Sequence, residues 1–452
     1  MADQETMFEP LYTTLKEKKL RKLRSELIEM NEVDVAAFME SLDTEKMMVV
    51  FRLLPKDLAT DVFSCMEIEN QTHIINSTGD RELQQIIEDL FVDDAVDMID
   101  ELPAIVVKRI LKTATPQTRN LINQFLNYPD NSAGSIMTAE YVALKKHMTV
   151  EQSFAYIRAN GVDKETIYTC YVTSDKRELE GVITLKDLLM NPYETVISDI
   201  MDTNVIKTTT TIDQEEASEL FNKYDLLALP VVDNENRLVG IITVDDVLDV
   251  MEAEATEDME KMAAILPSDK QKPYLKQTSI ELWKSRIPWL LLLMISATFT
   301  GMIITSFEDS LQKFVVLTAY IPMLMDTGGN SGSQASVTVI RGISLKDIEF
   351  KDIFRVIWKE IRVATLCGLT LGLCNFVKLL LLDRLTILVA ATICLTLIVT
   401  IFCAKLVGCT LPLIAFKLGF DPAVMASPFI TTIVDAISLI VYFQFATHLL
   451  GL

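Results

Sequence analysis

Residues that bind soft metals or form disulfides are scarce in this sequence of 452 residues. Its seven cysteines are scattered without a Cys-x-x-Cys pair, and its three histidines lie far apart. We therefore expect neither a disulfide framework, nor a zinc site, nor a histidine metal cluster. An apolar signal-peptide region is also missing between Met1 and Pro10, which predicts that the N-terminal part stays in the cytosol.

Basic charge is in short supply in the first 270 residues. The whole chain has 41 Lys and Arg against 63 Asp and Glu, a net charge of −22. Residues 1–270 hold 26 basic and 52 acidic residues, whereas residues 271–452 hold 15 and 11 and are strongly apolar. An acidic surface excludes nucleic acid as a partner, because phosphate binding needs basic side chains, and it attracts cations. The pattern indicates a soluble acidic half joined to a membrane half.

Residues 1–132 have the pattern of an all-α N-terminal domain. From about residue 20 to 130, apolar side chains recur at spacings of three and four, as in amphipathic helices. The step Leu54-Pro55 recurs 48 residues later as Leu102-Pro103, each time before an amphipathic segment. Because Pro is favoured at a helix start, the repeat suits a helical-repeat superhelix. An ordinary helix bundle with two Pro-initiated helices is the alternative.

Residues 133–250 alternate short β-rich runs with helical stretches, and they also repeat. The run Gly181–Leu189 returns 59 positions later as Gly240–Leu248. Each copy has an apolar strand, a Thr suited to cap a helix, and an acidic residue in the first helical turn. This double match resembles a tandem pair of α/β CBS domains, which implies a regulatory module that often binds adenine nucleotides or metal ions. Residues 251–270, rich in acidic side chains, are predicted to form a connecting helix.

Five runs in residues 271–452 are long enough and poor enough in charge to cross a bilayer. They lie at about 287–307, 314–340, 362–382, 385–411 and 422–448. Twelve basic residues flank one side of these runs and two flank the other. The positive-inside rule then places the N-terminus in the cytosol and the C-terminus outside. We predict a multi-pass protein with a five-helix transmembrane domain.

Two carboxylates lie near the middle of predicted spans, Asp326 in the second and Asp435 in the fifth. A carboxylate at the bilayer centre costs several kcal/mol, so it normally faces a partner or a watery pathway. No basic residue lies at matching depth, which makes a bound cation the natural partner. A protonated or helix-capping Asp is the alternative interpretation of either residue.

Oxygen-bearing residues accompany both carboxylates. Ser427, Thr431 and Asp435 are four apart and share one helix face. Residues 326–334 are rich in Gly and polar residues, so they allow either a local break that exposes carbonyls or close helix packing alone. Such hard oxygen ligands suit Mg2+ or Ca2+ rather than soft metals. The candidate ion-pathway residues are Asp435, Thr431, Ser427, Asp326, Gly328, Gly329 and Asn330.

Two segments together resemble the MgtE family of bacterial Mg2+ channels and transporters. They are the run Pro322–Gln334 and the run Gly419–Ala423 that leads to Asp435. The resemblance covers nearly the whole chain, and it also includes the order of N domain, CBS pair, connecting "plug" helix and membrane spans. It implies a Mg2+-selective importer in the plasma membrane, the inner membrane of a bacterium. It further implies a homodimer in which Asp435 of both subunits holds a hydrated Mg2+.

The resemblance departs from the family pattern at one pathway position. Asn commonly occupies the position of Ser427, so the effect of Ser on selectivity is open. The family contributes a backbone carbonyl at the position of Thr431. Family CBS pairs can also bind ATP, and no residue of this sequence decides whether this one does.

The resemblance also implies feedback by cytosolic Mg2+. In the family, Mg2+ bridges acidic residues among the N domain, the CBS pair and the plug helix, and so closes the pore. Solvated helix faces are the alternative interpretation of each of these carboxylates. With Asp435, the matching metal-site residues are Asp61, Asp93, Asp97, Asp213, Glu215, Asp225, Asp246, Asp249, Glu254, Glu257 and Asp258.

Other functions stay open at this point. A carrier for Mn2+ or Co2+, or a transporter coupled to H+ or Na+, would also use oxygen ligands. A CBS-regulated enzyme is not expected, because the membrane half has no nucleophile–base pair. A CBS-bearing anion channel is disfavoured by the two midplane carboxylates.

Overall fold

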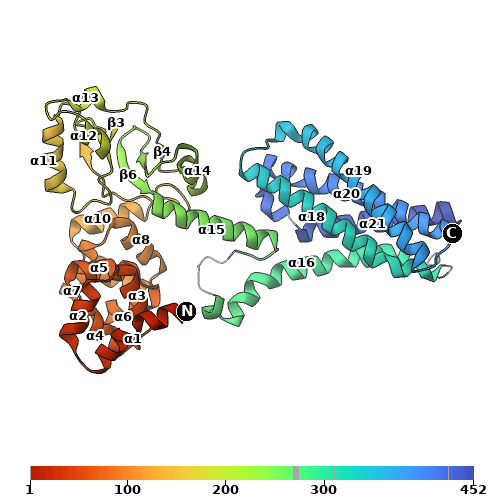
Figure 1. The fold of residues 1–452 in the computed structure, drawn as a ribbon, viewed down its shortest axis with the longest axis horizontal. Helices are drawn as coiled ribbons and strands as arrows, with labels where there is room; N and C mark the ends of the chain where they lie inside the picture. Colours follow the sequence, from red (N-terminus) through yellow and green to blue (C-terminus); the bar gives the residue numbers. More distant parts are fainter. Residues whose placement is uncertain (1, 268–273, 309–311, 313, 426, 452) are drawn as a thin grey trace. The chain divides into compact units, whose positions relative to one another are not determined.

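A computed structural model describes residues 2–267, 274–308, 312, 314–425 and 427–451. The chain divides into two compact units, Met1–Met251 and Glu252–Leu452 (Figure 1). The first holds the acidic half and the second holds the apolar helices, so the charge boundary in the sequence lies close to the boundary between the units.

The N-terminal part of the first unit is helical in the described residues. Pro55 and Pro103 are the N-caps of two of its helices, as the Leu-Pro steps predict. In this domain α3 packs on α5, α5 on α7, and α7 on α9, a staggered order that favours the helical repeat over a simple bundle. The helices are α1 (Ala2–Lys16), α2 (Leu20–Ile28), α3 (Glu32–Glu40), α4 (Thr44–Phe51), α5 (Lys56–Ser64), α6 (Ile68–Ser77), α7 (Asp80–Asp89), α8 (Val92–Glu101), α9 (Ala104–Thr113) and α10 (Pro116–Phe125).

The CBS region consists of two small sheets with the same topology. In each sheet the first strand pairs parallel with the second, and the second pairs antiparallel with the third. The first copy contains β1 (Ala143–Leu144), α11 (Val150–Asn160), β2 (Thr169–Thr173), β3 (Leu179–Thr184), α12 (Leu185–Met190) and α13 (Ile197–Ile200). The second contains β4 (Thr208–Thr209), α14 (Gln214–Tyr224), β5 (Ala228–Val232), β6 (Leu238–Thr243) and α15 (Val244–Met262).

The two repeated Thr residues act at the junction of strand and helix. The Thr184 side chain caps α12 in a capping box with Asp187. The Thr243 hydroxyl donates to Asp246 over 2.6 Å at the start of α15. The predicted Thr cap is therefore confirmed at Thr184, and Thr243 occupies the corresponding strand-to-helix junction in the second copy.

Residues 251–262 of the predicted connecting helix are helical, but they do not form an element of their own. α15 runs without interruption from Val244 to Met262, so the last CBS helix and the expected connecting helix are one element. The physical reason is that no Gly or Pro interrupts these 19 residues, which are rich in good helix formers. Residues 268–270 of the prediction lie outside the described residues.

The second unit is a bundle of long helices (Figure 1). α18, α19 and α21 all pack on α20, and α16 packs on α21. The long helices are α16 (Ser279–Ser306), α18 (Ile321–Ser344), α19 (Ile353–Leu381), α20 (Ile387–Lys417) and α21 (Ser427–Leu450). Short 3-10 segments are η1 (Tyr274–Lys276), η2 (Val315–Tyr320), η3 (Phe350–Asp352) and η4 (Pro422–Met425).

The prediction of five apolar spans is wrong in number. Four helical segments among the described residues are long and apolar enough to cross a membrane, namely Ser279–Ser306, Phe350–Leu381, Ile387–Lys417 and Pro422–Leu450. The expected span 314–340 corresponds largely to α18, which does not reach that level. The prediction counted charges alone, whereas the uncharged polar and Gly residues of the run 326–334 also lower the hydropathy of the helix.

Glycines let three helices of this bundle approach closely. A Cβ on Gly328 would lie 2.7 Å from Thr400 Cγ2 of α20, and one on Gly332 would lie 2.8 Å from Ile430 Cγ2 of α21. A Cβ on Gly408 of α20 would overlap the backbone carbonyl oxygen of Gly332. Small residues at such contacts are typical of helix packing in membranes.

We expect Gly408→Ala to destabilise the helical unit by about 1–3 kcal/mol, because backbone atoms cannot move aside as a side chain can. The measurement is thermal unfolding of the full chain in detergent. Gly301→Ala on α16 is the matched control, since nothing lies within 4 Å of the position that its new methyl group would take. Equal melting temperatures for the two variants would contradict the close contact of α18 and α20.

Candidate functional site

Two carboxylates of the helical unit lie close enough to repel each other electrostatically. Asp435 comes from α21 and is half-buried, and Asp326 comes from α18 and is exposed in the single chain. The Oδ1 atom of Asp435 is fully buried and has no hydrogen-bond partner among the described residues. A buried, unpaired carboxylate oxygen is costly unless a cation or water satisfies it.

α18 presents one polar face and one packing face. Asp326, Asn330 and Gln334, each four residues apart, are exposed and form one stripe along the helix. Gly328 and Gly329 lie on the buried face, which corresponds to the packing alternative for these two glycines. The alternative of a local break is not borne out, because α18 is continuous from Ile321 to Ser344.

The predicted stripe on α21 is only partly described. Thr431 lies against α18, where a Cβ on Gly329 would be 2.8 Å from Thr431 Cγ2. Thr431 and Asp435 are one helical turn apart on the same helix. Ser427 begins α21, but its side chain lies outside the described part of the structure.

A second group of carboxylates lies within the first unit, and we call it the N–CBS acidic cluster. Its members come from helix α8 of the N domain and from the CBS region. The carboxylates of Asp93, Asp94, Asp97 and Glu165 are each repelled by at least one other member. The cluster consists of Asp93, Asp94, Asp97, Glu165 and Asp246. The sequence reasoning missed Asp94, although it adjoins Asp93, and Glu165, for which no sequence signal exists.

Burial and mutual repulsion raise the pKa values of this cluster. Burial first, and then neighbouring carboxylates, raise the pKa of Asp93 to about 8 and that of Asp94 to about 6. The same two causes raise the pKa of Asp97 and of Glu165 to about 7 each. Part of the Asp97 side chain still reaches solvent, so Asp93 is the more strongly perturbed of the two. Burial also raises the pKa of Asp246, although the Thr243 hydrogen bond opposes this.

The cluster is an electrostatic arrangement rather than a finished metal site. Among the described residues, no group of three or more His, Cys, Asp or Glu side chains is arranged closely enough to hold a metal ion. One oxygen of Asp93 is buried without a hydrogen-bond partner in the described structure. The carboxylates therefore repel one another. Protonation, or a divalent cation bound between them, would reduce this repulsion.

The end of α15 carries a cation that the sequence reasoning did not single out. Lys261 Nζ lies 2.7 Å from Glu257 and 2.6 Å from Asp421, which directly precedes η4. Burial and the nearby Asp421 raise the pKa of Asp258 on the same helix. Glu257 and Asp258 thus lie beside Asp421, and Lys261 already neutralises part of their charge.

Comparison with known proteins identifies the family. The family model "Divalent cation transporter" matches residues 321–445, "MgtE intracellular N domain" matches 30–131, and "CBS domain" matches 133–193 and 197–253. The "Magnesium transporter MgtE" of Thermus thermophilus is 38% identical over 444 residues, which cover 97% of this chain and 98% of the relative. The chain belongs to the MgtE family. The protein of the same description from Bacillus subtilis is 32% identical and covers 96% of this chain and 95% of its own length.

Two solved structures of magnesium transport proteins resemble the acidic half. A structure described as the soluble part of a magnesium transporter is 30% identical with a TM-score of 0.53, and it covers 56% of this chain and 99% of that chain. The cytosolic domain of the Mg2+ channel MgtE in complex with ATP is 39% identical with a TM-score of 0.50, and it covers 53% and 98%. The MgtE relatives and the apolar helices together establish a multi-pass membrane protein that carries a CBS pair.

The remaining residues suggested by the MgtE resemblance are more dispersed. Asp61 on α5 is exposed, and its pKa is raised by partial burial and then by nearby carboxylates. Asp213 caps α14 by accepting from the Glu215 backbone N–H over 2.9 Å. Asp225 ends the same helix in a left-handed conformation, with φ of 51°. Local structure accounts for the side chain of Asp213 and the backbone of Asp225.

The acidic positions along α15 differ in exposure. Asp249 is exposed, whereas Glu254 is half-buried. Glu215, at the start of α14, is also exposed. None of these three belongs to the N–CBS acidic cluster as defined above, so their roles as metal ligands stay predictions.

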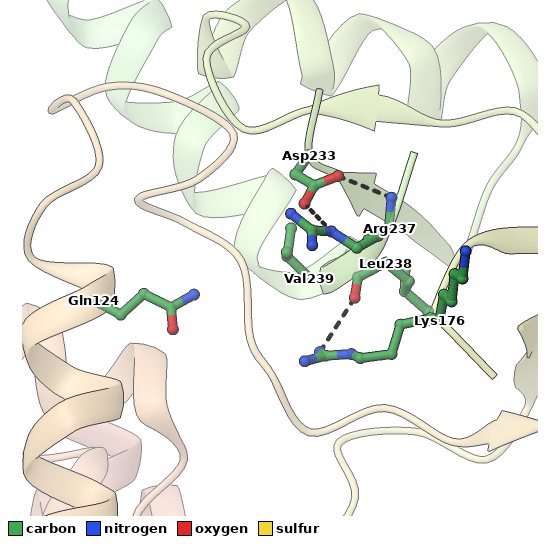
Figure 2. Close-up of a pocket in the computed structure, with 7 residues that line it drawn as sticks. Gln124, Lys176, Asp233, Arg237, Leu238 and Val239 are labelled. Carbon is green, nitrogen blue, oxygen red and sulfur yellow. Dashed lines mark hydrogen bonds and ion pairs between the residues drawn. The ribbon is translucent and has the colours of Figure 1, made fainter. Parts of the chain in front are cut away.

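A cationic cavity of about 300 Å³ lies beside the two CBS hairpin turns (Figure 2). Its arginines are largely engaged within the fold. Arg237 pairs with Asp233 over 2.7 Å, and Arg177 donates to the Leu238 carbonyl over 3.2 Å. We therefore interpret these arginines as structural residues that stabilise the two hairpins. The lining residues are Gln124, Lys176, Arg177, Asp233, Arg237, Leu238 and Val239.

Proposed function

We propose that this MgtE protein is a Mg2+-selective channel that imports Mg2+ through the plasma membrane. The observation that carries the proposal is the buried Oδ1 atom of Asp435, which has no hydrogen-bond partner among the described residues and which the carboxylate of Asp326 repels. Two repelling carboxylates in an apolar helix bundle favour a divalent cation, and their hard oxygens suit Mg2+. The relatives described as magnesium transporters support the same ion. A broader divalent carrier for Mn2+ or Co2+, or an ion-coupled transporter, is the alternative.

We further propose that the channel is a homodimer. The polar stripe of Asp326, Asn330 and Gln334 is exposed in the single chain, although lipid would leave such side chains unsatisfied. A second copy that packs on this stripe would cover it and bring two Asp435 carboxylates to one pathway. α18 then serves as a polar inner helix of the bundle.

Closure by cytosolic Mg2+ is the regulatory part of the proposal. Without Mg2+, the N–CBS acidic cluster repels itself and favours a looser arrangement of N domain and CBS pair. Mg2+ bound among these carboxylates, and among the acidic residues of α15, would favour the compact closed state. A ligand shifts such an equilibrium only through its preference for one state, and several weak sites that prefer the closed state add their effects.

ATP is a second ligand that we propose for the CBS pair. The support is the related cytosolic domain that was solved in complex with ATP. No residue of this chain is assigned to the nucleotide. The distribution of basic residues supports an orientation with the N-terminus in the cytosol and the C-terminus outside. We propose no enzymatic activity.

The test of the proposed function is Mg2+ flux into liposomes that contain the purified full chain. Mg2+ on the face of the N-terminal half is varied separately, and Mn2+, Co2+, Na+ and a proton gradient replace or accompany Mg2+ in parallel. We expect Mg2+ flux without a coupling gradient, and inhibition by Mg2+ on the cytosolic face. Flux that needs an H+ or Na+ gradient, or that is equal for Mn2+ and Co2+, would favour the alternative.

The raised pKa values predict a pH dependence with a defined sign. Between about pH 4 and pH 8, the folded cluster holds protons that the unfolded chain has released. Without Mg2+, the contribution of the cluster to the free energy of unfolding is therefore fully present below about pH 4 and is lost as pH rises toward about 8. Because Mg2+ competes with these protons, it should raise the melting temperature more at pH 8 than at pH 6. Thermal unfolding with EDTA or Mg2+ at both pH values measures this.

Asp93→Asn is the informative variant for this prediction. It removes the carboxylate with the highest pKa of the cluster, so the pH dependence of the Mg2+ effect should become flatter. Glu29→Gln, which changes an exposed carboxylate of the same domain, is the control and should leave it unchanged. A Mg2+ effect that is the same at pH 6 and pH 8 in the unmodified protein contradicts the interpretation.

A further inference from the structure

A buried pair of opposite charges lies inside the helical unit. Lys405 of α20 is 4% exposed and Glu360 of α19 is 9% exposed. Lys405 Nζ lies 3.7 Å from Glu360 Oε2 and 3.5 Å from the Ser331 carbonyl oxygen of α18. One ammonium group therefore contacts two helices besides its own. Charged residues at such positions are rare, and they usually serve a function.

The pair lies directly behind the polar face of α18. Ser331 follows Asn330, a member of the exposed stripe. At the next residue, Gly332, α18 contacts Ala404 of α20 and Ile430 of α21, so this layer lies about one turn from Asp435. Lys405 thus places a positive charge one helix away from the proposed cation pathway.

The contacts of the Lys405 ammonium are too long for this ion pair to serve mainly in stabilising the fold. Both contacts of the ammonium are at or beyond the limit of good hydrogen bonds, and Glu360 Oε2 has no hydrogen-bond partner among the described residues. A buried ion pair recovers its desolvation cost only with excellent geometry. The main effect of Glu360 is therefore electrostatic rather than stabilising, because its carboxylate neutralises the charge of Lys405.

We propose that Glu360 is a charge-compensating residue that keeps the wall behind the cation pathway electrically neutral. Lys405 contacts the Ser331 carbonyl of α18 and Glu360 of α19, and the carboxylate of Glu360 prevents the ammonium from repelling Mg2+. Glu360 acts through Lys405 and does not touch the ion, so it is a positioning residue. This inference rests on the proposed Mg2+ pathway and adds a residue that determines its affinity for the ion.

The experiment measures the Mg2+ concentration that gives half-maximal flux in liposomes. Glu360→Gln keeps the shape of the side chain and leaves the ammonium uncompensated. A helix is about 10 Å across, and at this distance an unpaired charge in a medium of effective dielectric about 20 should raise half-saturating Mg2+ at least about tenfold. Glu360→Asp keeps the charge, and the double variant Lys405→Met/Glu360→Gln removes both charges, so both should stay within about threefold of the unmodified protein.

The controls separate electrostatics from packing and from the proposed function. Glu349→Gln breaks an exposed pair with Lys351 and should change nothing. A packing role predicts instead that the shorter Glu360→Asp is impaired as much as Glu360→Gln, and that result overturns the inference. If Glu360→Gln does not fold, a tenfold rise in either Glu360→Asp or the double variant overturns it. Absent Mg2+ flux in the unmodified protein sinks the proposed function, whereas unchanged half-saturation in a folded Glu360→Gln sinks only this inference.

Discussion

Asp435→Ala is expected to reduce Mg2+ flux in liposomes to the level of empty vesicles. The variant removes a half-buried carboxylate whose Oδ1 atom has no protein partner among the described residues. At about 4 Å and an effective dielectric of about 20, one unit charge contributes about 4 kcal/mol to the binding of a monovalent ion and more for Mg2+. A loss of at least about a hundredfold in flux therefore follows. Asp435→Asn, which keeps the shape, should lose nearly as much.

A matched control lies one residue from the same stripe of α21. Thr432 donates its hydroxyl hydrogen to the Pro428 carbonyl over 3.1 Å, so its side chain is engaged within its own helix. Thr432→Ala should therefore conduct like the unmodified protein. If Asp435→Ala conducts as well as Thr432→Ala, the midplane carboxylate is a structural residue and the proposed pathway is wrong.

Joint replacement of Asp93, Asp97 and Asp246 by Asn is expected to leave the channel open at cytosolic Mg2+ that closes the unmodified protein. The three substitutions remove the negative charges that would bind Mg2+, and an amide oxygen is a much weaker ligand than a carboxylate. With the preference of Mg2+ for the closed state lost, the inhibitory concentration should rise at least about tenfold. Flux at increasing cytosolic Mg2+ measures the shift.

The control for the triple variant is Glu29→Gln, an exposed carboxylate of the same domain that lies outside the cluster. It should leave the inhibitory Mg2+ concentration unchanged. Inhibition of the triple variant at the same Mg2+ concentration as the control would mean that this cluster is a structural feature and that sensing takes place elsewhere, for example along α15. Basal flux without cytosolic Mg2+ should be unchanged in Glu29→Gln, whereas in the triple variant it should be the same or lower, because the repulsion that favours the looser arrangement is weakened.

Local sequence patterns predicted those features that depend on near neighbours in the chain. Pro55 and Pro103 start helices because their ring suits a helix N-terminus, and Thr184 and Thr243 mark strand-to-helix junctions because their hydroxyls bond three residues ahead. The count of apolar spans failed because charge alone was weighed, and α18 has few charges yet many polar side chains. Residues 251–262 continue the last CBS helix, because acidic composition does not end a helix.

The sequence by itself determined the acidic and apolar halves, the CBS repeat and the two midplane carboxylates, since each depends on composition or on fixed spacing along one element. The tertiary structure decided which charges meet. Glu165 joins Asp93, Lys261 meets Asp421, and Lys405 meets Glu360, although 45 to 160 residues separate each pair. The physical reason is that such contacts depend on how separate helices pack, and this packing is set by many small contacts that no short pattern contains.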